Sequence, residues 1–371
     1  MPPDGSPPPD RSPSHSGRSV LTTPPSDRPR ALETAKTAIL AFGAAALAIG
    51  FALATLVEPL PFAVQVVPLA VSVVFLGLPH GAVDHLVLPR ARGERATRRS
   101  IARLCVAYIA LAAVYALLWL LAPVVAFVGF IALTIFHWGQ GDVYALVDLL
   151  GADHLETRAQ RALALCVRGG IPMLVPLAAF PEQYAFVASA VVGLFDPAAA
   201  AALEPAFTPT ARRWIIVGVG ALVVGSLGWG LLRAGPSRSW LLDAGETVGL
   251  VAFFAVVPPV LAVGLYFACW HSIRHVLRTL LVDDVAAAAL ERHDGLPAAT
   301  RRFARDAAPM TAGALVVLGG LALTVPQTPA TPTDLLGVYL VCLAVLTLPH
   351  AAVVSLLDRE QGLWARRSDY P

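Results

Sequence analysis

Charged residues are scarce in this 371-residue chain. Only 14% of its residues are charged and 57% are hydrophobic, and Lys36 is its single lysine. A soluble domain of this size needs about 25% charged residues to cover its surface. This deficit excludes an ordinary water-soluble protein and indicates that much of the surface faces lipid.

Paired cysteines and a basic domain are also missing. Cys105, Cys166, Cys269 and Cys342 lie far apart in apolar stretches and form no CxxC pair. Neither a disulfide framework nor a zinc-thiolate site is therefore indicated. The arginines occur in short clusters between apolar runs rather than in a basic domain, which argues against nucleic-acid binding.

The two ends of the chain have no apolar run. Residues 1–35 are rich in Pro, Ser and Arg, and such a segment cannot bury enough surface to fold, so we expect a disordered cytoplasmic tail. It does not resemble a secretory signal, because no short apolar core follows a basic start. We expect a membrane-embedded domain over residues 36–358 and a short cytoplasmic tail over 359–371.

Between these ends, apolar runs near 20 residues predict an all-α, polytopic membrane bundle of about ten transmembrane helices, with nine as the alternative. The predicted spans are 37–56, 62–88, 102–121, 123–147, 161–180, 185–203, 214–233, 247–277, 307–325 and 334–356. The sixth is the weakest because it contains Asp196 and Pro197.

Arginine placement predicts the orientation. Under the positive-inside rule, ten spans put most arginine clusters and both termini on the cytoplasmic side of the cell membrane. Arg233 and Arg238 are then exceptions. Nine spans would place the basic 278–305 loop outside, which is worse.

Histidines gather in compact motifs on four even-numbered spans. The motifs are Leu78-Pro79-His80-Gly81-Ala82-Val83-Asp84-His85, Phe136-His137-Trp138-Gly139-Gln140-Gly141-Asp142, Trp270-His271-Ser272-Ile273-Arg274-His275 and Leu348-Pro349-His350. Because these spans run in the same direction, the motifs should meet at a similar depth, in the inner half of the bilayer. His154 and His293 lie in hydrophilic loops, where we expect solvated side chains.

The spacing within the motifs predicts a metal site. His271 and His275 are separated by four residues, so they share a helix face and could chelate one ion together with His80 and His137. Imidazole ligands suit Fe, Zn, Cu or Ni. Asp84 and Asp142 are candidates for supporting carboxylates.

Several neighbouring residues allow two interpretations. His350 could be a ligand, a supporting group or a packing residue, whereas His85 should point away from His80. Arg274 could orient Asp84 or Asp142, although a side chain extending to the membrane interface explains it more simply, as it does Arg168. Trp138 and Trp270 could line a substrate channel, and ordinary packing between helices explains them equally well. Pro79 and Pro349 should kink their helices beside His80 and His350.

The four motifs in this order resemble the Brp/Blh family of membrane-bound β-carotene 15,15′-dioxygenases, over about residues 65–360. The resemblance implies an Fe(II) enzyme that cleaves β-carotene, or a related carotenoid, with O₂ to give two all-trans-retinals, which a rhodopsin could use. It also implies His80, His137, His271 and His275 as the iron ligands. His85, directly after Asp84, departs from the family pattern and raises, as the less favoured alternative, a fifth imidazole near the metal.

Two other classes compete with this hypothesis. A membrane di-iron desaturase or hydroxylase needs roughly eight histidines with adjacent pairs, and this chain has no His-His dipeptide. A transporter or haem-binding protein could place histidines on facing helices. A proton-coupled transporter would, however, carry ionisable residues through the full membrane depth, whereas here they gather toward one side.

Overall fold

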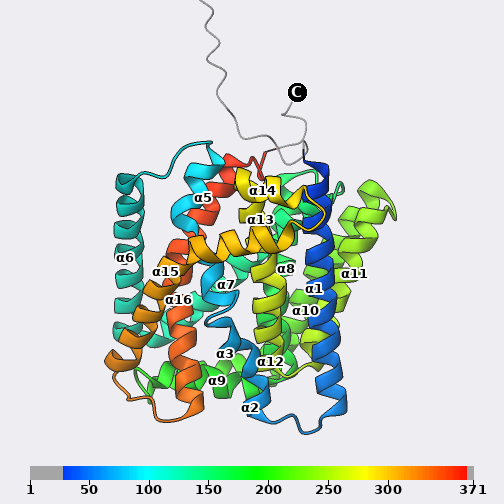
Figure 1. The fold of residues 1–371 in the computed structure, drawn as a ribbon. Coiled ribbons are helices and arrows are strands. Elements are labelled where there is room, and N and C mark those ends of the chain that lie inside the picture. The colour runs from blue at the N-terminus through cyan, green and yellow to red at the C-terminus, as the bar shows by residue number, and fades with distance from the viewer. Residues whose placement is uncertain (1–27, 366–371) are drawn as a thin grey trace, which may run out of the picture.

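A computed structural model describes residues 28–365, and every regular element in that range is helical (Figure 1). The first half contains α1 (Pro29–Leu56), α2 (Phe62–Gln65), α3 (Val67–Ser72), α4 (Gly77–Gly81), α5 (Asp84–Ala91), α6 (Arg98–Leu121), α7 (Pro123–Tyr144), the π-helix η2 (Ala145–Leu149), α8 (Arg158–Ala179) and α9 (Pro181–Gly193). The second half contains the 3₁₀ segment η3 (Ala199–Phe207), α10 (Pro209–Ala234), α11 (Arg238–Val256), α12 (Pro259–Leu265), the π-helix η4 (Tyr266–His271), α13 (Ser272–Val282), α14 (Asp284–Leu290), α15 (Leu296–Thr324) and α16 (Pro332–Glu360).

Ten helical segments within the described range are long and apolar enough to cross a membrane. They are Pro29–Leu56, Phe62–Ala91, Arg98–Leu121, Pro123–Leu149, Arg158–Ala179, Pro209–Ala234, Arg238–Val256, Pro259–Val282, Leu296–Thr324 and Pro332–Glu360. The described chain begins and ends at the same end of the bundle (Figure 1). This architecture confirms a polytopic, all-α membrane protein.

Two of the ten predicted spans are wrong in position. The region 185–203 contains only α9, which has 13 residues, followed by turns and η3, because Pro197 and Pro205 prevent a continuous α-helix. The region 247–277 belongs to two segments, because Pro258 and Pro259 end α11 and start α12. One predicted span does not cross the membrane and another contains parts of two spans, so the number of spans remains ten.

These corrections change where two arginine pairs lie. Because the long segments alternate in direction, the connection between α10 and α11 lies at the end of the bundle where the described chain begins and ends. Arg233 and Arg238 therefore join the other arginine clusters. Arg212 and Arg213, at the start of α10, now lie at the opposite end, where Arg212 donates to the carbonyl of Ala178 at the end of α8.

The chain becomes helical before the boundary at residue 35 that composition indicated. Helix α1 begins at Pro29, and Ala31 and Ala35 are fully buried. The Ala31 amide donates to Glu291 at 2.9 Å, which ties the helix start to the segment after α14. The expected disorder of residues 1–27, and the tail after residue 365, lie outside the described residues.

The second transmembrane segment is broken into α2, α3, α4 and α5. The main break precedes Pro79: the backbone turns at residues 73–76, where Leu76 has a φ of 66°. Gly77 follows because a Cβ there would lie 2.3 Å from the Ser72 carbonyl oxygen. Pro349, in contrast, stands inside the continuous helix α16. The break brings the short helix α4, which carries His80, into the interior.

Candidate metal centre

Five buried histidines gather in the interior of the bundle. His80 lies on α4, His137 on α7, His271 at the end of η4, His275 on α13 and His350 on α16. Each is at most 7% exposed. The structure thus brings the four predicted ligands together and adds His350 to them.

The imidazole rings contact one another directly. The Nε2 atoms of His137 and His271 are 3.1 Å apart. The ring centroid of His80 lies 5.4 Å from that of His271 and 5.5 Å from that of His275. The centroids of His80 and His137 are 6.3 Å apart. Rings this close on three separate transmembrane segments form one cluster rather than several isolated packing contacts.

Many nitrogens in this cluster have no hydrogen-bond partner within the described chain. They include Nε2 of His80, His275 and His350 and Nδ1 of His137 and His271. The Nδ1 of His80 is bonded to the Gly77 carbonyl, which leaves its Nε2 for the cluster. Buried polar atoms are expected to have partners. A metal ion bound by imidazole nitrogens would satisfy several of them at once.

Local sequence explains how the rings come so close. A Cβ on Gly81 would lie 3.1 Å from the Nδ1 of His350, and one on Gly141 would lie 3.3 Å from the Cε1 of His271. Both positions therefore lie directly against an imidazole. The π-helix η4 ends at His271, and π-helical turns occur frequently at functional sites.

Asp84 contacts the cluster as expected of a supporting carboxylate. Its Oδ2 accepts a hydrogen bond from the Nδ1 of His350 at 2.7 Å and another from the Tyr108 hydroxyl. Tyr108, on α6, belongs to no histidine motif, and sequence reasoning did not identify it. Its place 24 residues after Asp84 gives no local signal.

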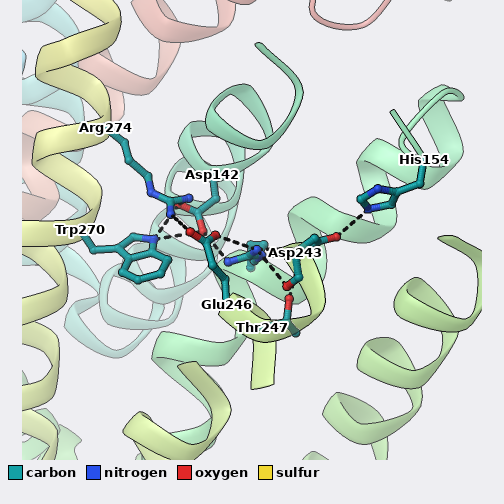
Figure 2. Close-up of polar contacts among 8 residues, drawn as sticks. Asp142, His154, Asp243, Glu246, Thr247, Trp270 and Arg274 are labelled. Carbon is teal, nitrogen blue, oxygen red and sulfur yellow. Dashed lines mark hydrogen bonds and ion pairs between the residues drawn. The ribbon is translucent and has the colours of Figure 1, made fainter. Parts of the chain in front are cut away.

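Asp142 belongs to a different cluster, which we call the ion network. It comprises Asp142, Asp243, Glu246 and Arg274 (Figure 2), together with Arg168. Asp142 is fully buried and lies 3.2 Å from Arg274, 3.4 Å from Arg168 and 3.1 Å from the Trp270 indole nitrogen. It is hydrogen-bonded to none of the five clustered histidines. The expectation that it supports a ligand directly is not met.

The interpretation of Arg168 and Arg274 as side chains extending to the membrane interface is wrong. They are 1% and 2% exposed. Arg168 pairs with Asp243 at 2.7 Å and with Glu246 at 3.0 Å, while Arg274 pairs with Glu246 at 2.7 Å. The carboxylates on α11 were missed because Asp243 and Glu246 carry no motif. Guanidinium groups can remain this deep because carboxylates surround them.

The remaining histidines differ from one another. His154 is 1% exposed and lies 2.9 Å from Asp243, so the prediction of a solvated side chain is wrong for it (Figure 2). His293 is exposed as predicted. The Nδ1 of His85 faces the carbonyl of Ala82 at 3.1 Å, and no ring contact joins it to the five clustered histidines.

An apolar cavity of about 360 Å³ lies against the cluster. His80 and His350 form part of its wall, and α6, α15 and α16 supply most of the rest. Ile109 and Val317, which also line it, are exposed on the outer surface of the bundle. The cavity therefore connects the surface to the imidazoles. Trp138 and Trp270 do not line it; they pack against Tyr266 in the interior.

Comparison with known proteins supplies the chemical context. A family model described as beta-carotene 15,15′-dioxygenase matches residues 71–358. "Probable beta-carotene 15,15′-dioxygenase Blh" of Halobacterium salinarum is 46% identical over 291 residues, covering 78% of this chain and 83% of that protein. "Probable beta-carotene 15,15′-dioxygenase Brp" of the same species is 36% identical over 302 residues, with the same coverage of both chains. No solved structure matches.

Proposed function

Because this chain belongs to the β-carotene 15,15′-dioxygenase family, we propose that it cleaves the central double bond of β-carotene with O₂. The 15,15′ bond breaks, each of its two carbons gains one oxygen atom, and two molecules of all-trans-retinal result. The observation that carries this proposal is the contact between an apolar, surface-connected cavity and a buried cluster of imidazoles. We assign this chemistry to the membrane-embedded residues 36–358.

We assign iron(II) to this cluster, with His80, His137, His271 and His275 as its ligands. Neutral imidazoles are ligands that iron accepts, and their unpartnered nitrogens fit a bound ion. Iron(II), when bound, supplies the redox chemistry that O₂ needs to react with a polyene. The protein supplies the ligand geometry and a site shielded from water, because all four side chains are at most 7% exposed.

The cavity suits a substrate dissolved in the lipid bilayer. Ile109 and Val317 line it near the surface, and His80 and His350 line it at the cluster. A hydrocarbon chain could enter between α6 and α15 without crossing water. Apolar walls give such a substrate a favourable environment. Apart from the histidines, polar substrates would find few partners there beyond Asp84, Tyr108 and Thr347.

The same geometry disfavours the haem alternative. A haem bound by two histidines must lie between their rings, whereas the rings of His137 and His271 contact each other with centroids 4.8 Å apart. A di-iron centre would require more histidines than the five that gather here. One metal ion is the simpler occupant of this cluster.

We infer a location in the cell membrane with both termini cytoplasmic. Most arginine clusters, Arg233 and Arg238 included, lie at the end of the bundle where the described chain begins and ends, as the positive-inside rule expects, and Arg212 and Arg213 are the exceptions. Supply of retinal to a rhodopsin is a further prediction that follows from the product.

The test is expression in a bacterial strain that makes β-carotene. We expect the wild-type protein to remove the carotenoid colour and to form retinal. His271→Ala should abolish retinal formation and lower the iron content of the purified protein, because it removes one of the four assigned iron ligands. His293→Ala, which changes an exposed histidine outside the cluster, is the matched control and should behave as wild type.

Two results would contradict the proposal. One is undiminished retinal production by His271→Ala in a protein that carries no iron. The other is formation of apocarotenals of other chain lengths by the wild type, which would move the cleavage away from the central bond.

A further inference from the structure

His350 occupies a central place in the imidazole cluster. Its ring centroid lies 4.7 Å from that of His137 and 4.9 Å from those of His80 and His275. It therefore contacts three of the four rings assigned to iron. Candidate ligand atoms of His80, His137 and His350 all lie within 4.8 Å of one another. A metal ion placed among the other imidazoles would thus have His350 beside it.

The orientation of the His350 ring follows from its hydrogen bond to Asp84. The Nδ1 of His350 and the Oδ2 of Asp84 are 2.7 Å apart. Because a carboxylate can only accept hydrogen bonds, Nδ1 carries the proton and Nε2 keeps its lone pair. That Nε2 is buried and has no hydrogen-bond partner. A metal-binding imidazole typically shows this arrangement, with its other nitrogen donating to a carboxylate.

Tyr108 holds the carboxylate in turn. Its hydroxyl donates to the same Oδ2 of Asp84 that His350 uses. The three side chains come from α5, α6 and α16, so the chain of hydrogen bonds joins separate helices at one point. All three also line the apolar cavity. Two donors on one oxygen restrict the carboxylate and, through it, the imidazole.

Charge balance supports the same role for Asp84. A divalent ion surrounded by neutral imidazoles keeps its full charge in a low-dielectric interior. Asp84 can offset part of that charge because it is bonded directly to a clustered histidine. The carboxylate of Asp142 lies between Arg168 and Arg274, which already neutralise it.

We propose that His350 is a fifth imidazole ligand of the metal, and that Asp84 and Tyr108 are positioning residues that hold its ring. This inference rests on the proposed function, because it presumes an ion among the other four imidazoles. A six-coordinate ion with five imidazole ligands keeps one open position.

The test uses Co²⁺ as a probe on the purified full-length protein stripped of metal. Co²⁺ absorbs visible light weakly in five-coordinate sites and strongly in four-coordinate ones, and its affinity follows from competition with a chelator. We expect wild type to show a weak absorption band and His350→Gly to show a stronger one with reduced affinity. Added imidazole should restore the wild-type spectrum in His350→Gly, which a merely structural role would not allow.

The positioning residues should have graded effects on Co²⁺ affinity. Asp84→Asn should weaken binding about 10–100-fold, as loss of a carboxylate behind a ligand typically does. Tyr108→Phe should weaken it less. Tyr115→Phe is the matched control on the same helix, because the Tyr115 hydroxyl donates to the Ala126 carbonyl and does not line the cavity. It should bind Co²⁺ as wild type does.

The outcomes separate this inference from the proposed function. If His137→Ala abolishes Co²⁺ binding while His350→Gly leaves spectrum and affinity unchanged, His350 is not a ligand and only this inference fails. If His350→Gly does not fold, unchanged affinity in both Asp84→Asn and Tyr108→Phe overturns it instead. A wild-type protein that binds no Co²⁺, or binds it equally well after His137→Ala, would overturn the metal centre itself.

Discussion

The two aspartates that follow histidine motifs lie in contrasting surroundings. Asp84 contacts His350 and Tyr108 at the wall of an apolar cavity, on what we call the cavity side. Asp142 lies between Arg168 and Arg274 in the ion network, on α7, α8, α11 and α13. The same residue type thus bonds a clustered imidazole on one side and pairs with arginines of neighbouring helices on the other. Asp84 follows His80 by four residues, whereas Asp142 follows His137 by five, an offset that turns a side chain away on a regular helix.

The ion network joins helices that carry candidate ligands. Arg274 lies on α13 next to His275, and Asp142 lies on α7 five residues after His137. Their ion pair, at 3.2 Å, holds the two helices in register. Arg274 also lies over the Trp270 ring, 4.2 Å from its centroid, next to His271. We therefore expect changes on this side to affect stability and changes on the cavity side to affect metal and substrate.

The largest expected effect separates the two aspartates. Asp142→Asn removes a fully buried negative charge that pairs with both Arg168 and Arg274, and leaves these guanidinium groups only Glu246 and Asp243 as partners. This loss should lower the free energy of unfolding by about 3 kcal/mol. Asp84→Asn keeps the shape and a hydrogen-bonding oxygen and should cost about 1 kcal/mol. Unfolding in detergent micelles, followed by circular dichroism, measures both. An equal loss of unfolding free energy in Asp142→Asn and Asp84→Asn would contradict the proposed difference between the ion network and the cavity side.

A smaller effect is expected from glycines between α7 and α8, beside the ion network. A Cβ on Gly169 would lie 1.8 Å from the carbonyl oxygen of Ile135, so Gly169→Ala should force the helices apart. Overpacking of this kind costs about 1–3 kcal/mol. Gly170→Ala is the neighbouring control, since its Cβ would meet only Leu174 at 3.7 Å. A Gly169→Ala protein as stable as Gly170→Ala would show that this packing does not limit stability.

The smallest effect should come from the outer part of the cavity. Gly313 on α15 lines it, and a Cβ there would meet no atom within 4 Å. Gly313→Val should therefore leave stability unchanged while narrowing the path for the substrate. KM for β-carotene should rise severalfold with little change in kcat.

Gly319→Val provides the control for this change. Gly319 lies on the same helix, also has open space around its Cβ position, and does not line the cavity. Retinal formation by purified protein in detergent gives both constants. An equal rise in KM for the two variants would argue against substrate entry beside α15.

The histidine cluster could be predicted from the sequence, because the depth of a residue in the bilayer follows from the direction of its transmembrane span and its position along that span. Four motifs on segments that run the same way should meet at one depth, and the histidines of all four do so: His80, His137, His271 with His275, and His350. Most spans could be predicted as well, because a helix that crosses the membrane needs about 20 consecutive apolar residues. The error at 247–277 came from reading a long apolar run as one helix although Pro258 and Pro259 interrupt it.

Other features depend on contacts between distant segments, which a single sequence does not reveal. From the sequence alone, Arg168 is interpreted as an arginine at the membrane interface, whereas in the structure it pairs with Asp243 and Glu246 on another helix. His154 belongs to a polar loop by composition yet packs beside Asp243. Tyr108 is one of several aromatic residues on apolar helices until Asp84 is placed beside it. Each of these pairings requires the tertiary arrangement.

The π-helical turn η4 has a consequence for the angular phase of its segment. It runs from Tyr266 to His271, between the regular helices α12 and α13. Because a π-turn contains an extra residue, side chains before it are rotated about the helix axis relative to those after it. The apolar face of α12 and the face of α13 that carries His275 can therefore point in different directions around the helix axis. Removing one residue from this turn would shift the phase of His271 relative to Tyr266 while leaving the composition of the span almost unchanged.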